Sequence, residues 1–86
     1  MKINEKRLIK IWCRLDNRAR YLDELMVNKN ISDDMFKVWY LERDRLSLIL
    51  LELAIVCGYP YIDMFQRHII DDNLGIWDSE TKRWVI

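Results

Sequence analysis

Glycine and proline are scarce in this sequence of 86 residues, which contains two glycines and one proline. Because these residues form many tight turns, their scarcity favours long helices over a sheet with many turns. Two glycines cannot build a glycine-rich phosphate-binding loop, and no serine stands in the glycine frame of a nucleophile elbow. The sequence therefore gives no support to nucleotide-binding loops or to hydrolase chemistry of these kinds.

Histidine and cysteine are also scarce. His68 is the single histidine, and Cys13 and Cys57 form no CxxC pair, which is poor material for a zinc site. The segment "DDNLGIWDSE" is spaced like the start of a calcium loop. However, Ile76 occupies the position that requires glycine, and Lys82 the position that requires glutamate. We therefore expect no catalytic residues, no metal and no cofactor, and hence a protein that is not an enzyme.

Long apolar runs are absent as well. The longest, "LSLILLELAIVC", is interrupted by Glu52 and falls short of the roughly 20 apolar residues that cross a bilayer. The N-terminal "MKINEKRLIK" lacks the apolar core of a secretory signal. Two cysteines without an export signal are expected to be free thiols in a reducing compartment. The sequence thus predicts a cytoplasmic protein that does not enter a membrane.

The residues that are present indicate one small globular domain covering residues 1–86, because 51% are apolar and 33% are charged. A chain of this size buries a limited core, and many such domains gain stability by associating. A homodimer is therefore one of our expectations.

Apolar residues at spacings of three and four predict two long helices. The first covers about 5–27 with Asn4 as N-cap, and the second covers about 33–57 with Ser32 as N-cap and Gly58 after its end. The short connection makes them antiparallel neighbours. The predicted core positions are Leu8, Ile11, Trp12, Leu15, Ala19, Leu22, Leu25 and Met26 in the first helix, and Met35, Val38, Trp39, Leu46, Ile49, Leu50, Leu53 and Cys57 in the second.

The last third of the chain predicts a short helix over about 60–70, opened by Pro60, and a β-hairpin over about 75–86. In the expected register Trp77 faces Trp84, Ile76 faces Val85 and Gly75 faces Ile86, with residues 78–83 as the connection. The predicted fold is therefore mainly α: a long antiparallel helical hairpin, a short third helix and a C-terminal β-hairpin.

The second half of the second helix has more apolar residues than one neighbouring helix can cover. From residue 46 to 57 only Ser47 and Glu52 are polar, so Leu48, Leu51 and Ile55 need another cover. The C-terminal segment, a second copy of the chain and a target protein all qualify. If the C-terminal segment does not act as this cover, an uncovered edge strand of the hairpin or the face of Trp77 and Trp84 is a candidate partner-binding element.

Charge is distributed unevenly although the net charge is zero. Residues 1–20 hold seven basic and two acidic side chains, an excess of five positive charges. Four of the basic residues recur at helical spacing and define a basic ridge: Arg7, Lys10, Arg14 and Arg18. Such a ridge could bind an acidic protein surface or nucleic-acid phosphate. The alternative is internal pairing with Glu42 and Asp44 of the second helix.

The stretch "ELAIVCGYPYIDMFQRHI" resembles a DNA-reading helix-turn-helix over about 20 residues, and with the following hairpin it is similar to a winged helix. The resemblance implies that Gly58 makes the turn and that Tyr61, Gln66 and Arg67 face DNA. Against it, Asp63 repels phosphate and nothing breaks the preceding helix. A DNA-binding regulator is therefore the alternative. Our main prediction is a small binding protein with another protein as partner, of the kind that phages and mobile elements encode as regulators or inhibitors.

Overall fold

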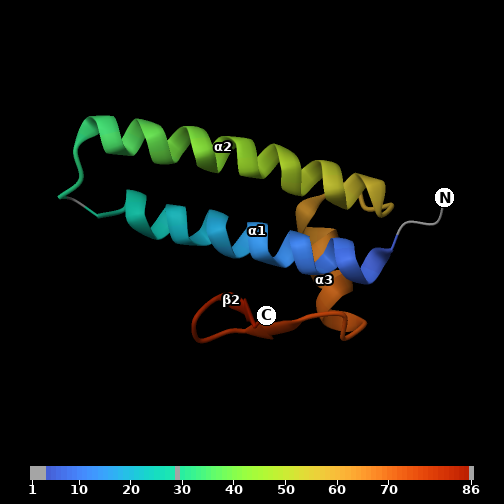
Figure 1. Cartoon of the computed structure of the whole chain (residues 1–86). Coiled ribbons are helices and arrows are strands. Elements are labelled where there is room, and N and C mark those ends of the chain that lie inside the picture. The colour runs from blue at the N-terminus through green and yellow to red at the C-terminus, as the bar shows by residue number, and fades with distance from the viewer. Residues whose placement is uncertain (1–3, 29, 86) are drawn as a thin grey trace.

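The computed structural model describes residues 4–28 and 30–85. Helices α1 (Glu5–Met26) and α2 (Asp33–Val56) are antiparallel neighbours, and α3 (Ile62–Asp71) crosses near the N-terminal half of α1 (Figure 1). Strands β1 (Ile76–Asp78) and β2 (Arg83–Val85) form an antiparallel hairpin. It lies beside α1 on the side away from α2 (Figure 1). The predicted mainly helical fold is confirmed.

Side-chain caps begin both long helices where the sequence predicts them. The Asn4 carboxamide oxygen accepts a hydrogen bond from the backbone N–H of Arg7 at 3.3 Å. The Ser32 hydroxyl accepts one from the N–H of Met35 at 3.2 Å. These bonds satisfy N–H groups that have no partner within the first helical turn. Glu5 in α1 and Asp33 in α2 then place negative charge at the positive end of each helix dipole.

The two later helices end in the same kind of Schellman turn, in which a residue of positive φ follows the last helical turn. Gly58 has φ of 92°, and the N–H of Tyr59 donates to the carbonyl of Ala54 at 2.9 Å. Asn73 has φ of 55°, and the N–H of Leu74 closes the equivalent bond at 2.9 Å. These two turns aim α3 across α1 and return the chain along α1.

Two boundaries differ from the prediction. Helix α3 begins at Ile62, because Tyr61 has an extended backbone with φ of −132° and ψ of 145° and acts as the N-cap. Pro60 therefore precedes the helix. In the hairpin Asp78 pairs with Arg83, so the connection is residues 79–82 and not 78–83.

The predicted register of the hairpin is confirmed for two of its three predicted residue pairs. Trp77 faces Trp84, and Ile76 faces Val85. The predicted pairing of Gly75 with Ile86 lies outside the described residues.

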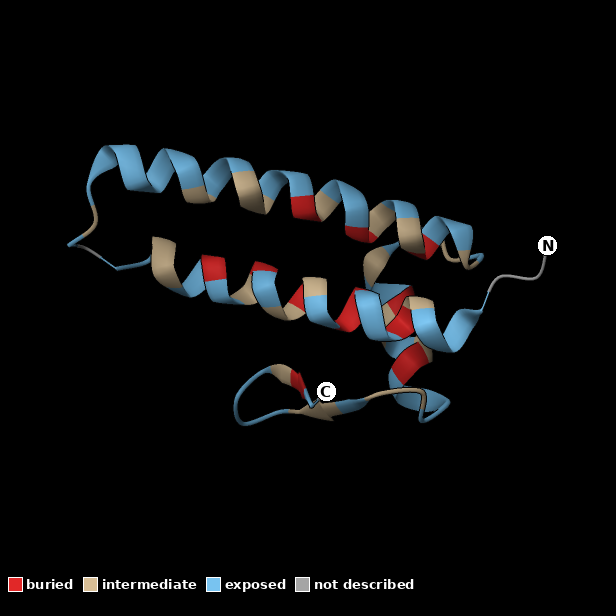
Figure 2. Ribbon diagram, in the orientation of Figure 1, coloured by how far each residue is buried: buried red, intermediate tan, exposed pale blue. Residues whose placement is uncertain are grey.

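Trp12 is at the centre of the core, where it contacts α2, α3 and β2. Its indole N–H donates to the carbonyl of Leu50 in α2 at 3.0 Å. Its ring meets Phe65 of α3 edge-on at 5.2 Å and Trp84 of β2 at 6.1 Å. Figure 2 shows the buried positions of α1 and α2 facing each other. The buried apolar residues are Ile9, Trp12, Cys13, Ala19, Leu22, Leu46, Leu50, Ala54, Phe65, Ile69 and Trp84.

Four predicted core positions are wrong: Ile11, Met35, Val38 and Ile49 are exposed. Helix α2 packs mainly against α1 and α3, and in its central part it buries a narrow line through Leu46 and Leu50. Helix α1 instead has a second inward side, because the hairpin packs against it. The sequence pattern cannot distinguish one broad buried side from two.

The structure also decides what the C-terminal hairpin covers. Strand β2 contacts α1, and the hairpin is separated from α2 by α1 (Figure 1). The idea that it covers the apolar surplus of α2 is therefore wrong. The physical reason is a set of polar contacts that ties Trp84 to α1.

Candidate functional site

Trp84 is anchored to two consecutive residues of α1. The Asn17 carboxamide oxygen accepts the Trp84 backbone N–H at 2.7 Å, and the Asn17 amide donates to the Trp84 carbonyl at 2.9 Å. The Trp84 indole N–H donates to the buried Asp16 carboxylate at 2.8 Å. Trp77 meets Trp84 edge-on at 5.0 Å, and the Arg20 guanidinium stacks over Trp77 at 4.7 Å.

These contacts turn the tryptophan face of the hairpin toward α1. Trp84 is only 3% exposed, whereas Ile76 and Val85 on the opposite face are 67% and 56% exposed. The exposed face of the hairpin is therefore aliphatic and not aromatic. Trp77 and Trp84, predicted as a candidate partner-binding face, are placed in the packing against α1.

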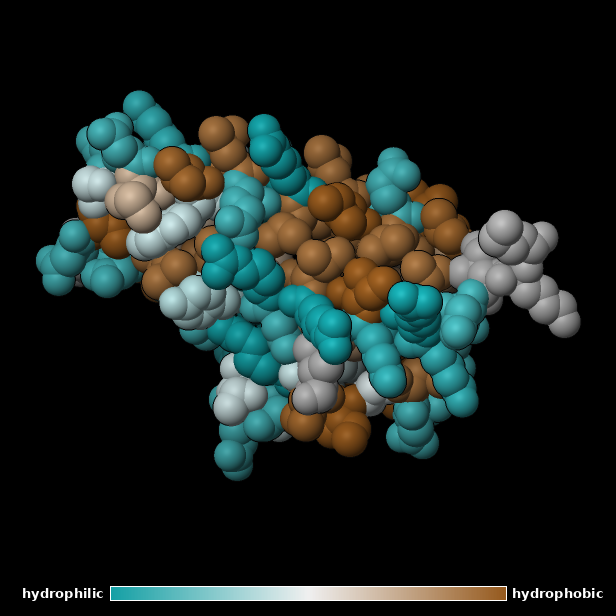
Figure 3. Space-filling view, viewed as in Figure 1, coloured by the Kyte–Doolittle hydropathy of each residue, from teal (hydrophilic) through white to brown (hydrophobic). Residues whose placement is uncertain are grey.

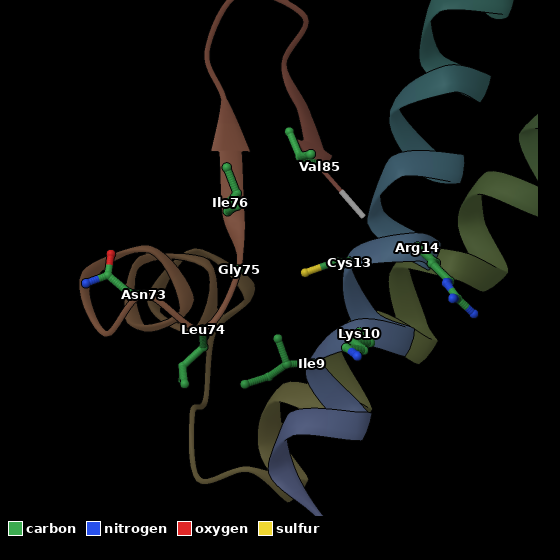
Figure 4. A pocket seen from close by; sticks show the side chains of 9 residues that line it. All are labelled: Ile9, Lys10, Cys13, Arg14, Asn73, Leu74, Gly75, Ile76 and Val85. Atoms are coloured by element: carbon green, nitrogen blue, oxygen red, sulfur yellow. The ribbon is translucent and has the colours of Figure 1, made fainter.

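A groove of about 460 Å³ lies between α1 and the hairpin, and we call it the tail groove (Figure 4). The buried residues Ile9 and Cys13 form its inner part. Lys10 and Arg14, one helical turn apart on α1, flank it on one side, and the hairpin flanks it on the other. The complete lining is Ile9, Lys10, Cys13, Arg14, Asn73, Leu74, Gly75, Ile76 and Val85.

Close packing, and not reactive chemistry, characterises the inner part of the groove. A Cβ added to Gly75 would lie 2.9 Å from Ile69 Cγ2 and 3.6 Å from Cys13 Sγ, so only glycine fits there. Burial, with a smaller effect of the Asp16 carboxylate, raises the pKa of Cys13 to about 12. The thiol is therefore protonated at neutral pH and is a poor nucleophile.

The structure divides the predicted basic ridge. Arg18 forms a two-pronged ion pair with Glu42 of α2, at 2.7 and 3.2 Å, and this hydrogen bonding lowers the pKa of Glu42. Arg7, Lys10 and Arg14 are exposed and form no ion pair with any carboxylate that the structure describes. Two of these three cations, Lys10 and Arg14, flank the tail groove.

A second apolar surface follows the seam between α1 and α2. The Arg18–Glu42 ion pair fixes which sides of the two helices meet there. Ile11 lies seven residues before Arg18 and Ile49 seven after Glu42. In antiparallel helices both steps run in the same direction by about 10 Å, so Ile11 and Ile49 lie close together. Figure 3 shows hydrophilic side chains between an apolar area over the long helices and a smaller one at the hairpin.

His68 makes a polar cluster that the sequence analysis missed. Its Nε2 lies 3.0 Å from a Glu5 carboxylate oxygen, its Nδ1 lies 2.8 Å from Asp72, and its ring stacks on Tyr59 at 4.6 Å. The spacing of His68 and Asp72 by four on a helix was visible in the sequence, whereas Glu5 is remote. Both ring nitrogens of His68 thus face carboxylates. The cluster ties α3 to the start of α1.

The residues predicted to face DNA lie on α3 or just before it. Tyr61 and Arg67 are exposed and Gln66 is half-buried. Arg67 stands four residues from both Asp63 and Asp71, and all three line one shallow hollow. These two carboxylates reduce the positive potential that phosphate would require.

Comparison of the chain with protein-family models, with curated proteins and with solved structures finds no match. Within residues 4–28 and 30–85, no helix is long and apolar enough to cross a bilayer. In the same part of the chain, no three His, Cys, Asp or Glu side chains gather as a metal ion would require.

Proposed function

We propose that this protein is a non-enzymatic binding protein that regulates or inhibits another protein. The ligand of the tail groove is an acidic, partly apolar segment of that protein. The observation that carries the proposal is the juxtaposition of two cations, neither in an ion pair with a described carboxylate, and an exposed aliphatic surface. Lys10 and Arg14 lie on the α1 side of the groove, with the Arg14 side chain directed away from the hairpin, and Ile76 and Val85 lie on the other side (Figure 4).

The electrostatics and the shape of the groove favour a ligand of this chemistry. A carboxylate beside Lys10 or Arg14 would gain a charge-assisted contact, since neither cation is paired with a described carboxylate. An apolar side chain of the ligand would cover Ile76 and Val85, which are otherwise exposed to water. A longer segment of the ligand could also contact the apolar surface along the seam between α1 and α2, which includes Ile11 and lies on the other side of the basic ridge.

An NMR titration tests this proposal with a defined probe. The probe is a short peptide in which Glu and Leu alternate, added to the ¹⁵N-labelled protein. We expect the backbone amide signals of Cys13, Arg14, Gly75 and Ile76 to shift, because these residues line the groove. Binding should weaken as salt is raised, because exposed charges contribute to it.

A matched pair of charge reversals provides the control. Lys10→Glu with Arg14→Glu should abolish the shifts, whereas Lys37→Glu with Lys82→Glu makes the same change of charge at exposed positions outside the groove and should leave them unchanged. Absence of shifts at millimolar peptide, or equal loss in both double variants, would contradict the proposal.

The alternative, a winged-helix-like DNA-binding regulator, is supported by the order of the elements: a helix, a turn at Gly58, a second helix and a hairpin. If it is correct, duplex DNA should shift the signals of Tyr61, Gln66 and Arg67, and Gln66→Ala or Arg67→Ala should weaken binding. The acidic neighbours of Arg67 lead us to expect no sequence-specific duplex binding at physiological salt. An electrophoretic mobility shift assay against a random duplex library distinguishes the two functions.

A further inference from the structure

The side of α2 that faces away from α1 carries a stripe of apolar residues. Leu41, Leu48 and Ile55 recur every seven residues and are 57%, 61% and 54% exposed. Leu51 lies between the last two at a spacing of three and four. Alternating spacings of three and four mark the seam of a coiled coil. We call these four residues the outer stripe.

No element that the structure describes covers Leu41, Leu48 or Ile55, and Leu51 is half-buried. The buried line of α2 runs through Leu46, Leu50 and Ala54 toward α1 and α3. The hairpin lies beyond α1, as Figure 1 shows. Exposed apolar stripes of this kind on small proteins mark interaction surfaces.

We propose that the outer stripe binds a second copy of this chain, with the two α2 helices antiparallel. The charged residues that flank the stripe identify the occupant. Arg45 and Glu52 are exposed, lie seven residues apart on one side of the stripe, and form no ion pair with other residues in the described ranges. A two-fold axis that crosses the outer stripe at the height of the midpoint between residues 45 and 52 places Arg45 of each copy opposite Glu52 of the other.

Asp44 supports the antiparallel arrangement over a parallel one. It occupies the outer-stripe position between Leu41 and Leu48. In a parallel pair in register, Asp44 would face Asp44 of the second copy within the apolar seam, where like charges repel. In the antiparallel pair the two carboxylates are separated by about 13–14 Å along the helix axis, at 1.5 Å per residue, and each lies toward one end of the interface.

The interface so formed is short, about four helical turns, so we expect a dimer that dissociates in the micromolar range. It leaves the tail groove free, because the groove lies across α1 from α2. The dimer would thus present two tail grooves on opposite outer sides. The proposal depends on α2 alone and stands or falls separately from the function proposed for the groove.

Sedimentation equilibrium from micromolar to millimolar concentration tests the proposal, and we expect the mean mass to rise from 10.6 kDa toward twice that value. Leu48→Glu should keep the protein monomeric without loss of helix signal, because the side chain is exposed. Ile49→Glu is the matched control, since Ile49 is also exposed but lies on the seam side of the same helix.

A charge swap tests the antiparallel pairing. Arg45→Glu or Glu52→Arg alone replaces two attractive contacts by two repulsive ones and should raise the dissociation constant about tenfold. The double variant with both changes restores the complementarity and should return the constant to the wild-type range. A wild-type protein that stays monomeric at every concentration would overturn the proposal. So would a double variant that is as weak as the single ones, or a binding loss in Ile49→Glu equal to that in Leu48→Glu.

Discussion

The side-chain amide of Asn17 in α1 brackets the backbone of Trp84 in β2, accepting its N–H at 2.7 Å and donating to its carbonyl at 2.9 Å. One carboxamide thereby makes both hydrogen bonds that a neighbouring strand would make to this residue. The backbone N–H and carbonyl groups of Trp84 at the outer edge of β2 are therefore hydrogen-bonded by a side chain of α1. This explains how a hairpin with strands of three residues is stabilised, since isolated two-stranded hairpins are marginal in water.

Replacement of Asn17 tests this anchoring. Asn17→Ala removes two partly buried hydrogen bonds and should lower the free energy of unfolding by about 1–3 kcal/mol. Asn17→Asp keeps the acceptor for the Trp84 N–H but loses the donor to its carbonyl, so its effect should be intermediate. Urea unfolding followed by tryptophan fluorescence measures both. The control, Asn30→Ala, changes an exposed asparagine; an equally large loss there would show that the two bonds to Trp84 are not the cause.

Gly75→Ala should lower stability by overpacking. The new Cβ would lie 2.9 Å from Ile69 Cγ2 and 3.5 Å from Trp84 Cε3, and such crowding costs about 1–3 kcal/mol. Gly58→Ala is the comparison, since a Cβ there has nothing within 4 Å but φ is 92°, a strain of about 1 kcal/mol. Thermal unfolding measures both. Only Gly75→Ala should also shift the NMR signals of the tail groove; unchanged groove signals would contradict the packing argument.

The Cys13 thiol should resist alkylation and make stability depend on pH in the alkaline range. Its pKa is raised from 9.0 to about 12 in the folded protein, so the unfolded state loses the proton first. The contribution of the thiol to the free energy of unfolding is therefore fully present below pH 9 and is lost as the pH rises toward 12. Between these values the free energy of unfolding should fall by at most about 1.4 kcal/mol per pH unit.

Alkylation of the two cysteines and the substitution Cys13→Ala test these two expectations. In native protein at pH 8, iodoacetamide followed by mass spectrometry should modify the more accessible Cys57 before Cys13. Cys13→Ala should be less stable at neutral pH, because it leaves a cavity, but should lose less stability than the wild type between pH 9 and 11. Rapid alkylation of Cys13 in native protein would contradict its burial.

Lys82→Gly should stabilise the hairpin. Lys82 has φ of 55°, a left-handed conformation that costs a residue with a Cβ about 1 kcal/mol and glycine almost nothing. Glycine also has greater conformational entropy in the unfolded state, which offsets part of this effect. We therefore expect the free energy of unfolding, measured in urea, to increase by about 0.5 kcal/mol. Thr81→Gly is the matched control: Thr81 is not among the described residues with positive φ, so the same substitution there should destabilise. A loss in both variants would contradict the argument.

The elements of this fold follow from local signals that are strong in the sequence. Asn4, Ser32 and Gly58 mark helix ends through contacts that span at most five residues. The pairing of Trp77 with Trp84 follows from the alternation of side chains between the two faces of each strand. Such signals act within a few residues, so a single sequence shows them.

The packing of the elements depends on contacts that the sequence does not reveal. Asp16 and Trp84 are separated by 68 positions, and Glu5 and His68 by 63. An aspartate is expected on the surface, but Asp16 is buried, and its carboxylate accepts a hydrogen bond from the Trp84 indole N–H. This long-range contact placed the hairpin on α1 and brought its aliphatic face next to Lys10 and Arg14. The ridge and the hairpin were each visible in the sequence, but their proximity was not.

The chain of indole rings from Trp12 through Trp84 to Trp77, with centroids 6.1 and 5.0 Å apart, has an optical consequence. Indole rings at these separations lie within the distance at which aromatic rings interact, so their transition dipoles should couple and give an exciton couplet in the far-ultraviolet circular dichroism spectrum. Trp39 lies apart on α2 and should not contribute to it. The couplet is therefore an intrinsic optical signal for the docking of the hairpin on α1. It should weaken when the hairpin detaches, even if the helices remain folded, because the contact between Trp12 and Trp84 is then lost.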